Sequence, residues 1–291
     1  MISNLEERVE LALKNIGDCP WLPELTTKLV SRGWRNLFRE VKLTPSKYGT
    51  GRVIVHDANA PRNIVSLLPM ILSDTNTKRV IQIETLVEDL INHYKDAGVR
   101  FYTIDELIMF RYIEHLKEAV KVLKCVPTLF HTVALLVKSI HLIDAYDDNY
   151  DISFSEPQIP FSIFVSIPRH SSSNNVLRIA EAIVHEAMHL QLTLVEQIVP
   201  LVISGNKTYF SPWKGENRSP QGLLHALYVF RVIDSFLRGV MLSGTATKDH
   251  KHYIYNRRSQ IAGEIEQVKL LQGCPQLTSW GDKFLQALLV R

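Results

Sequence analysis

Apolar residues recur every three to four positions along most of this 291-residue chain. That spacing gathers them on one face of a helix and leaves the polar residues on the other face. The pattern therefore predicts helices for most of the sequence. We expect them near 4–16, 23–32, within 75–97, 103–124, 128–145, 174–199, 219–242, 247–271 and 277–290.

Two short stretches are typical of strands, and the second of them alternates with a period of two. They are "RVIVHD" (52–57) and "PFSIFVSIP" (160–168). Prolines stand at both ends of the second stretch, so we expect it at the margin of a sheet rather than at its centre. The chain contains no internal repeat and no linker-like segment. We predict a single domain over 1–291 that is mainly α with a small β-sheet (α+β).

Capping residues support two of the predicted helix starts. Ser219 is a favourable N-cap, and Pro220 suits the first helical position. Thr103 and Glu106 have the spacing of a capping box. Helices should therefore begin at these two places.

Composition narrows the function classes. A formal net charge of +3 is too small to indicate nucleic acid or an anionic membrane as a partner. The sequence contains no uncharged apolar run of about 18 residues, so it predicts no membrane-spanning helix. The widely spaced Cys19, Cys125 and Cys274 are typical of reduced thiols, so we expect a cytoplasmic protein. The acidic segment 144–151 and the basic segment 248–260 are typical of solvated surface.

The most informative motif is His-Glu-x-x-His, within "AEAIVHEAMHLQLTLVE" (180–196). Residues four apart share a helix face, so His185 and His189 can offer imidazole nitrogens to one metal ion. The apolar flanks place this helix in the core, where a metal site is held rigidly. A chance pairing of two core histidines with an unrelated glutamate is the alternative. The motif predicts a zincin-like helical domain with its metal site on two helices.

A catalytic metal needs a third protein ligand and an open position for substrate. Leu192 and Val195 stand where the long zinc-protease pattern has glycine and histidine, which excludes that pattern. Glu196 lies about 10 Å beyond the second histidine along the helix, too far to bind the same ion. Glu216 belongs to a predicted loop. His225, near the start of the next helix, is the better candidate, with an ordinary core histidine as the alternative.

Four sequence elements follow one another within 160–236: "PFSIFVSIP", "AEAIVHEAMHLQLTLVE", "YFSPW" and "RSPQGLLHALYVFR". In this order they resemble the HExxH-type, 2-oxoglutarate/Fe(II)-dependent peptide β-hydroxylases found with ribosomally made peptide natural products. The resemblance makes 160–236 the metal- and co-substrate-binding core segment. The family pattern has Arg-Pro before its Gly-Leu-Leu-His, whereas here Ser219 separates Arg218 from Pro220.

The resemblance implies Fe(II) rather than zinc, bound by His185, His189 and His225, with 2-oxoglutarate as co-substrate. It implies a dioxygenase that hydroxylates a side-chain (β) carbon in a peptide, such as the precursor of a ribosomally synthesised natural product. Ligand chemistry does not decide the metal, because three imidazoles also make a good zinc site.

A cationic residue should hold the far carboxylate of 2-oxoglutarate. Arg218 lies just before the helix that carries His225, where exposed N–H groups favour an anion, and arginine can grip a carboxylate through two hydrogen bonds. Arg178, seven residues before His185, is the competitor. We favour Arg218, and a surface salt bridge is the alternative role for either arginine. Trp213 of the Ser-Pro-Trp motif is a further residue that we expect at the cofactor.

The role of Glu186 depends on the chemistry. In a peptidase it would be the catalytic general base that activates a metal-bound water. In an oxygenase it would orient a ligand, position the substrate or protect the iron. Glu181 and Glu196 are candidate acceptors for histidine N–H groups around the metal.

Three functions of different classes stay open at this point. They are the oxygenase, a zinc metallopeptidase of the HExxH class, and a non-enzymatic, metal-stabilised peptide-binding module. Strand 160–168 precedes the metal helix by a short loop, so we expect a peptide substrate to add to it as a further strand. The alternative is that this strand is simply part of the core.

Overall fold

The computed structural model of the chain describes residues 3–17, 19–43, 66–68, 81–84, 91–92, 94–95, 98–144, 151–155, 161–169 and 172–290. These residues are mainly helical and include a small mixed sheet, so the predicted α+β class is confirmed. The chain divides into two compact units, one of Val30–Leu190 and one that joins Met1–Leu29 to Gln191–Arg291. Their boundaries fall inside helices α2 (Pro23–Leu43) and α8 (Asn175–Glu196). The single domain expected over the whole chain stays a prediction.

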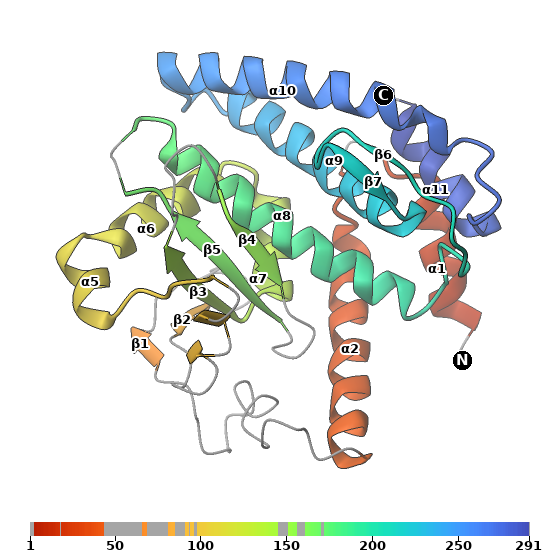
Figure 1. The fold of residues 1–291 in the computed structure, drawn as a ribbon, viewed down its shortest axis with the longest axis horizontal. Coiled ribbons are helices and arrows are strands. Elements are labelled where there is room, and N and C mark those ends of the chain that lie inside the picture. Colours follow the sequence, from red (N-terminus) through yellow and green to blue (C-terminus); the bar gives the residue numbers. More distant parts are fainter. Residues whose placement is uncertain are drawn as a thin grey trace. The chain divides into compact units, whose positions relative to one another are not determined.

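The unit of Val30–Leu190 is built on a five-stranded sheet with the order β1-β2-β3-β5-β4 (Figure 1). The strands are β1 (Ser66–Leu68), β2 (Gln82–Glu84), β3 (Ser139–Asp144), β4 (Ser153–Ser155) and β5 (Ser162–Ile167). β3 pairs in parallel with β2 and β5, while β4 pairs antiparallel with β5. Parallel strands are covered on both faces, and every residue of β3 and β5 is accordingly buried.

Several helices accompany the sheet in this unit. They are α5 (Ile104–Met109), α6 (Tyr112–Leu123), α7 (Pro127–Leu136) and the part of α8 up to Leu190. Aromatic rings link the strands to one another. Phe164 of β5 stacks on Phe154 of β4 with centroids 4.4 Å apart, and on His141 of β3 at 4.7 Å. These contacts join three strands into one packed face.

The prediction of one buried helix over 128–145 is wrong in its second half. α7 ends at Leu136, and the chain continues into strand β3. A short apolar run does not by itself distinguish a buried helix from a buried strand. Ile140 and Ile143 are β-branched and pack well on a pleated surface. The pairing of β3 with its two neighbours therefore decides the local structure.

The helix expected over 103–124 is interrupted. Its capping box is confirmed, since Glu106 Oε2 accepts from the Thr103 backbone N–H at 2.9 Å and Thr103 Oγ1 accepts from the Glu106 N–H at 3.2 Å. The chain then breaks at Arg111, whose φ of 56° is left-handed, and this separates α5 from α6. The apolar periodicity of the sequence continues across Arg111, so the sequence gives no sign of this break.

Three further predictions concern the segments around the sheet. The helix expected within 75–97 does not include Gln82–Glu84, which form β2, whereas residues 91–92 and 94–95 are helical. The predicted strand 52–57 lies outside the described residues, as does most of the acidic segment 144–151.

The prediction that 160–168 lies at the margin of a sheet is wrong. β5 has β3 on one side and β4 on the other, and it is buried throughout. Pro168 follows the strand and removes no hydrogen bond from the ladder, so it does not force the strand to the edge. A peptide therefore has no open edge on β5 to join. At this end of the sheet, β4 is the last of the described strands.

The unit of Met1–Leu29 and Gln191–Arg291 consists mainly of helices. Its elements, besides the adjoining parts of α2 and α8, are α1 (Ser3–Lys14), the antiparallel pair β6 (Tyr209–Ser211) and β7 (Glu216–Arg218), α9 (Pro220–Leu242), α10 (Lys248–Val268), the 3-10 helix η1 (Lys269–Leu271) and α11 (Ser279–Leu289). α9 begins as predicted, because Ser219 accepts from the Gly222 N–H and Pro220 takes the first helical position.

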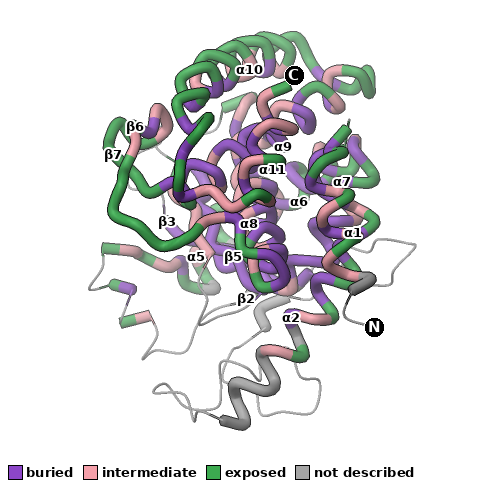
Figure 2. Tube along the Cα trace, turned by 90° about the vertical axis from the view of Figure 1, so that its right-hand side faces the viewer, coloured by how far each residue is buried: buried purple, intermediate pink, exposed green. Residues whose placement is uncertain are grey.

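α10 is amphipathic and turns one narrow stripe to the core. The stripe consists of Ile254, Ile261, Ile265 and Val268. Exposed residues run along its outer side, including most of the basic segment 248–260 (Figure 2). Among the described helices, none combines the length and apolar character needed to cross a membrane.

Candidate metal centre

His185 and His189 lie together on α8, one helical turn apart. Their Nε2 atoms are 3.1 Å apart, and their rings meet edge to face with centroids 4.8 Å apart. Two nitrogens that bind one ion at about 2.1 Å are separated by about 3.0 to 3.4 Å when the angle at the ion lies between a right angle and a tetrahedral one. The pair therefore has the separation that a shared ion requires. The same separation also permits a hydrogen bond between the two rings.

The helix around this pair is firmly anchored. Val184, Ala187 and Met188 are fully buried, whereas the His185 side chain is 28% exposed. The apolar residues hold the helix in place, and the imidazoles lie on its more accessible side. A metal site needs this combination of rigid support and an open side.

Glu186, the second residue of the motif, is held by a strand of the sheet. Its side chain is 3% exposed, and Ser153 Oγ of β4 donates to Oε1 at 2.8 Å. The same oxygen lies 3.9 Å from His185 Nε2. β4 therefore fixes the carboxylate beside the histidine pair. Sequence reasoning missed Ser153, because an ordinary serine in a short strand carries no signal.

His225 of α9 is held by a carboxylate at the end of α8. Its Nε2 lies 2.9 Å from Glu196 Oε2, and Gln221 Nε2 donates to the same oxygen at 3.1 Å. Both side chains of the His225–Glu196 pair are largely buried. Since an ionised carboxylate only accepts, the donated hydrogen is on His225 Nε2. The predicted contact between Glu196 and a histidine N–H is thus present.

The three predicted ligands are divided between the two units. His185 and His189 belong to the unit of Val30–Leu190, and His225 belongs to the other unit. Over the described part of the chain, no three His, Cys, Asp or Glu side chains are grouped as ligands for a metal ion. The three-histidine site therefore stays a prediction. The geometry supports only the pairing of His185 with His189.

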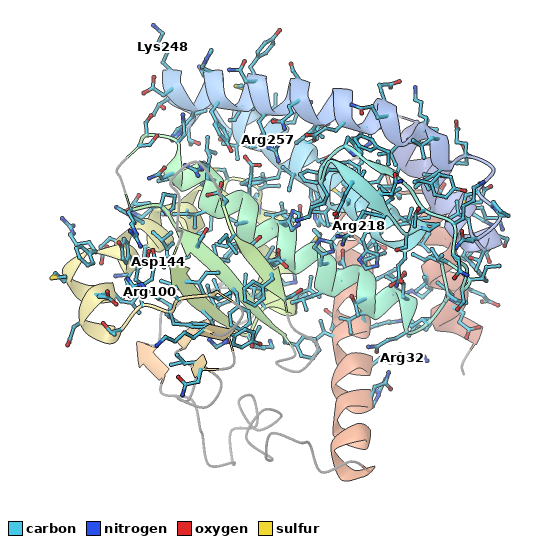
Figure 3. The ribbon with its side chains drawn as sticks, in the orientation of Figure 1. Arg32, Arg100, Asp144, Arg218, Lys248 and Arg257 are labelled. Carbon is cyan, nitrogen blue, oxygen red and sulfur yellow. The ribbon has the colours of Figure 1, made fainter. Side chains whose placement is uncertain are left out.

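Both arginines considered for 2-oxoglutarate have carboxylate partners. Arg218 of β7 (Figure 3) donates to Glu216 at 2.8 Å, and both side chains are about half exposed. Its Nε passes the start of α9, 3.8 Å from where a Cβ on Gly222 would lie. Arg178 donates two hydrogen bonds to Asp151, at 2.9 and 2.8 Å. An exposed single contact contributes little stability, so a ligand carboxylate would displace the partner of Arg218 more easily than that of Arg178.

Trp213 packs on the helix that carries His225. Its ring stacks on Phe230 with centroids 5.0 Å apart and planes 10° from parallel. Arg257 lies over the Phe230 ring, 5.3 Å from its centroid. The indole Nε1 of Trp213 is buried and has no hydrogen-bond partner within the described ranges. A buried N–H without an acceptor is costly, so a ligand oxygen would be stabilised at this atom.

A buried polar network begins two residues after His189. Gln191 Nε2 donates to the Trp21 carbonyl and to Thr26 Oγ1, both at 2.8 Å, and Tyr228 of α9 donates its hydroxyl hydrogen to Gln191 Oε1. Burial raises the pKa of Tyr228, which keeps this hydroxyl a donor. The network ties the end of α8 to α9 and to the start of α2. A glutamine inside an apolar helical run was the available signal, and sequence reasoning missed it.

Asp144 forms a second buried polar cluster at the end of β3. Arg100 Nε donates to it at 2.7 Å and Tyr102 OH at 3.0 Å, and Arg169 donates from beyond β5 (Figure 3). Burial by itself would raise the pKa of the Asp144 carboxyl, but the hydrogen bonds from Arg169, Arg100 and Tyr102 hold that pKa below its usual value. The ionised carboxylate therefore joins the carboxyl ends of β3 and β5.

No protein-family model matches this sequence, and no curated protein matches it significantly. The resemblance to the peptide β-hydroxylases therefore rests on the motifs alone. Its implications for the metal, the co-substrate and the reaction are hypotheses.

Proposed function

We propose that this chain is an Fe(II)- and 2-oxoglutarate-dependent dioxygenase that hydroxylates a side-chain (β) carbon of a peptide. The observation that carries the proposal is the 3.1 Å separation of Nε2 atoms between His185 and His189, which suits two ligands of one ion. The ordered motifs within 160–236, which resemble those of HExxH-type peptide β-hydroxylases, add the third histidine. In this proposal the helix α8 and the adjoining sheet form a zincin-like arrangement.

Three histidines would hold the iron. His185 and His189 would be two ligands from α8, and His225 would be the third, from α9. Bound iron with 2-oxoglutarate and O2 supplies the oxidising power for hydroxylation, and succinate and carbon dioxide are released. Glu196 fixes the tautomer of His225 by accepting from Nε2, so an ion bound to this ring in the same orientation would take Nδ1.

Two groups next to α9 support binding of the 2-oxoglutarate carboxylates. The buried Nε1 of Trp213 can donate to a carboxylate oxygen. Arg218 can exchange its exposed contact with Glu216 for a two-bond contact with a carboxylate. Arg178 is the alternative anchor, but it would first have to give up both hydrogen bonds to Asp151.

β4 offers a place for the peptide that 160–168 does not. It is the last described strand at its end of the sheet, and its Ser153 contacts Glu186. A peptide that paired with β4 would be held by its backbone, largely independently of its sequence. Its side chains would then pass close to Glu186, which positions the substrate in this proposal.

A zinc metallopeptidase is the second candidate function. Its support is the carboxylate of Glu186, which lies 3.9 Å from His185 Nε2 and is therefore close to where a metal-bound water would be. A general base in a peptidase needs this proximity. The hydrogen bond from Ser153 would orient the carboxylate in either chemistry.

Anaerobic reconstitution with Fe(II) and 2-oxoglutarate tests the proposal. We expect a weak visible charge-transfer band from the ternary complex and, after admission of O2 with a peptide library, succinate and peptides heavier by one oxygen atom. A protein loaded with zinc that cleaves the peptides without O2 would instead be a peptidase. Peptide retention with neither outcome would indicate the non-enzymatic binding module.

A further inference from the structure

A cavity of about 650 Å³ opens in the unit of Met1–Leu29 and Gln191–Arg291. The end of α1, the loop that follows it, α9 and α11 supply its walls. Its volume lies within the range of about 300 to 1,000 Å³ that is usual for small-molecule sites. None of the residues predicted for the metal or for 2-oxoglutarate lines it. The cavity is therefore a separate candidate site.

Much of the cavity wall is apolar. The residues that form this part are Ile16, Pro20, Ala287, Leu288 and Val290. Ile16 and Leu288 are buried, whereas Val290 is 82% exposed. An apolar ligand in the cavity would remove part of the Val290 side chain from water, which is favourable by about 25 cal/mol per Å² of covered surface.

Cationic side chains form another part of the wall. Lys14, Arg231 and Lys283 line the cavity against a single carboxylate, Asp282. Glu10 lies outside the cavity lining, and its Oε1 is 2.6 Å from Lys14 Nζ and 3.4 Å from Lys283 Nζ. The lining therefore carries an excess of positive charge, and Glu10 offsets only part of it.

Arg231 is the most informative of these residues. Its side chain comes from the middle of α9, is only 8% exposed, and donates from Nε to the Leu288 carbonyl at 2.5 Å. Lys14 lies in the last turn of α1, where a cation offsets the helix dipole and needs no other explanation. The bond from Arg231 reaches the last turn of α11, and the Lys283 ammonium lies 5.7 Å from the centroid of the Trp280 ring. An arginine is nevertheless seldom buried this far beside a cavity.

We propose that this cavity binds a small carboxylic acid with an apolar body. The carboxylate lies against Arg231 and Lys283, and the hydrocarbon part packs on Ile16, Ala287 and Val290. Charge selects the acid over a neutral or cationic molecule of the same shape. The apolar wall selects it over a small hydrophilic anion.

Octanoate binding to the full chain tests this site by isothermal titration calorimetry, with octanol and octylamine as matched ligands. We expect octanoate to bind at least tenfold more tightly than either of the others. Lys283→Met should weaken octanoate binding about fivefold, as expected for one exposed charge contact. Glu10→Gln should strengthen it, because both lysines lose a competing carboxylate. Lys269→Met, on η1 and outside the cavity, should leave it unchanged.

A steric variant completes the test. Ala287→Trp should abolish octanoate binding by filling the cavity, while its far-ultraviolet circular dichroism stays like that of the unmodified protein. The proposal is overturned if octanoate fails to bind at millimolar concentration, or if octanol binds equally well. Equal effects of Lys283→Met and Lys269→Met would also overturn it. These readouts are independent of iron, 2-oxoglutarate and turnover.

Discussion

Nε2 of His225 lies 2.9 Å from Oε2 of Glu196, and this hydrogen bond joins the start of α9 to the end of α8. Histidines that bind metals usually donate their other ring N–H to a carboxylate or a carbonyl, which fixes their tautomer and orientation. His225 already has such a carboxylate. The pair therefore has the arrangement that a ligating histidine needs.

Glu196→Ala should lower the affinity for Fe(II) about 10- to 100-fold, because the ring of His225 would lose its orienting acceptor. Competition with a metal-sensitive fluorescent chelator under anaerobic conditions measures this affinity. Glu118→Ala, an exposed carboxylate paired with Lys121 on α6, is the matched control and should have no effect. An unchanged affinity in the Glu196 variant would show that this bond does not support a metal ligand.

His185→Ala or His189→Ala should each abolish stoichiometric metal binding, because the remaining nitrogen loses its partner 3.1 Å away. Metal content after reconstitution and desalting, measured by mass spectrometry, reports the result. His131→Ala changes a histidine of α7 and should retain one equivalent of metal. Full occupancy after loss of either motif histidine would remove that residue from the ligand set.

Arg218→Ala should raise the concentration of 2-oxoglutarate needed for half-saturation about 10- to 150-fold, since a hydrogen bond to a charged group is worth about 1.5–3 kcal/mol. Glu216→Gln removes the negative charge that pairs with Arg218 and should leave this value equal or lower. Titration of the charge-transfer band measures both. If Arg178→Ala produces the increase and Arg218→Ala does not, the anchor is Arg178.

Tyr228→Phe should lower the free energy of unfolding by about 1–3 kcal/mol, because it leaves a buried oxygen of Gln191 without its donor. Urea unfolding measures the change. Replacing both partners, as in Tyr228→Phe with Gln191→Leu, tests whether the two residues act together. Strictly additive losses from the two single variants would show that the hydrogen bond contributes little.

Asp144→Asn should destabilise the protein at neutral pH by about 2 kcal/mol, because Arg100 and Arg169 lose the charge of their buried partner. The cost stays below that of a fully buried ion pair, since both arginine side chains are partly exposed. The folded-state pKa of Asp144 is depressed below the unfolded value of 3.8. The carboxylate therefore contributes its stability above that value and loses it as the pH falls through the folded-state pKa. The difference between variant and parent should accordingly shrink below pH 3.8 in urea unfolding series.

The exposed Glu114 is the control for this pH dependence. Its pKa is also lowered, by a hydrogen bond from Lys117, but both side chains are about half exposed. Glu114→Gln should therefore change stability very little at any pH. An equally small effect of Asp144→Asn would show that the buried cluster does not hold β3 and β5 together.

The C-terminal helices were predictable because their signals are local. Apolar periodicity, together with Ser219 and Pro220 at the start of α9, depends only on residues within a few turns of one another. The same holds for the histidine pair: helix geometry alone brings residues 185 and 189 to one face. No knowledge of the rest of the chain was needed for either prediction.

The sheet was not predictable in the same way. Residues 139–144 are as apolar as a buried helix, and they form a strand because β2 and β5 pair with them. Pro168 suggested an edge for β5, but β4, the preceding strand in the chain, pairs antiparallel with it and covers that side. Strand pairing is a long-range hydrogen-bond pattern, so the sequence of one strand does not contain it.

The sequence by itself thus determined the helical character of the chain and the pairing of His185 with His189, because both follow from the regular spacing of one helix. Only the tertiary structure decided which side chains support these groups. Ser153 beside Glu186, Glu196 beside His225, and Tyr228 beside Gln191 are separated by 33, 29 and 37 positions in the chain. Their contacts arise from packing between different elements, which no local pattern of residues encodes.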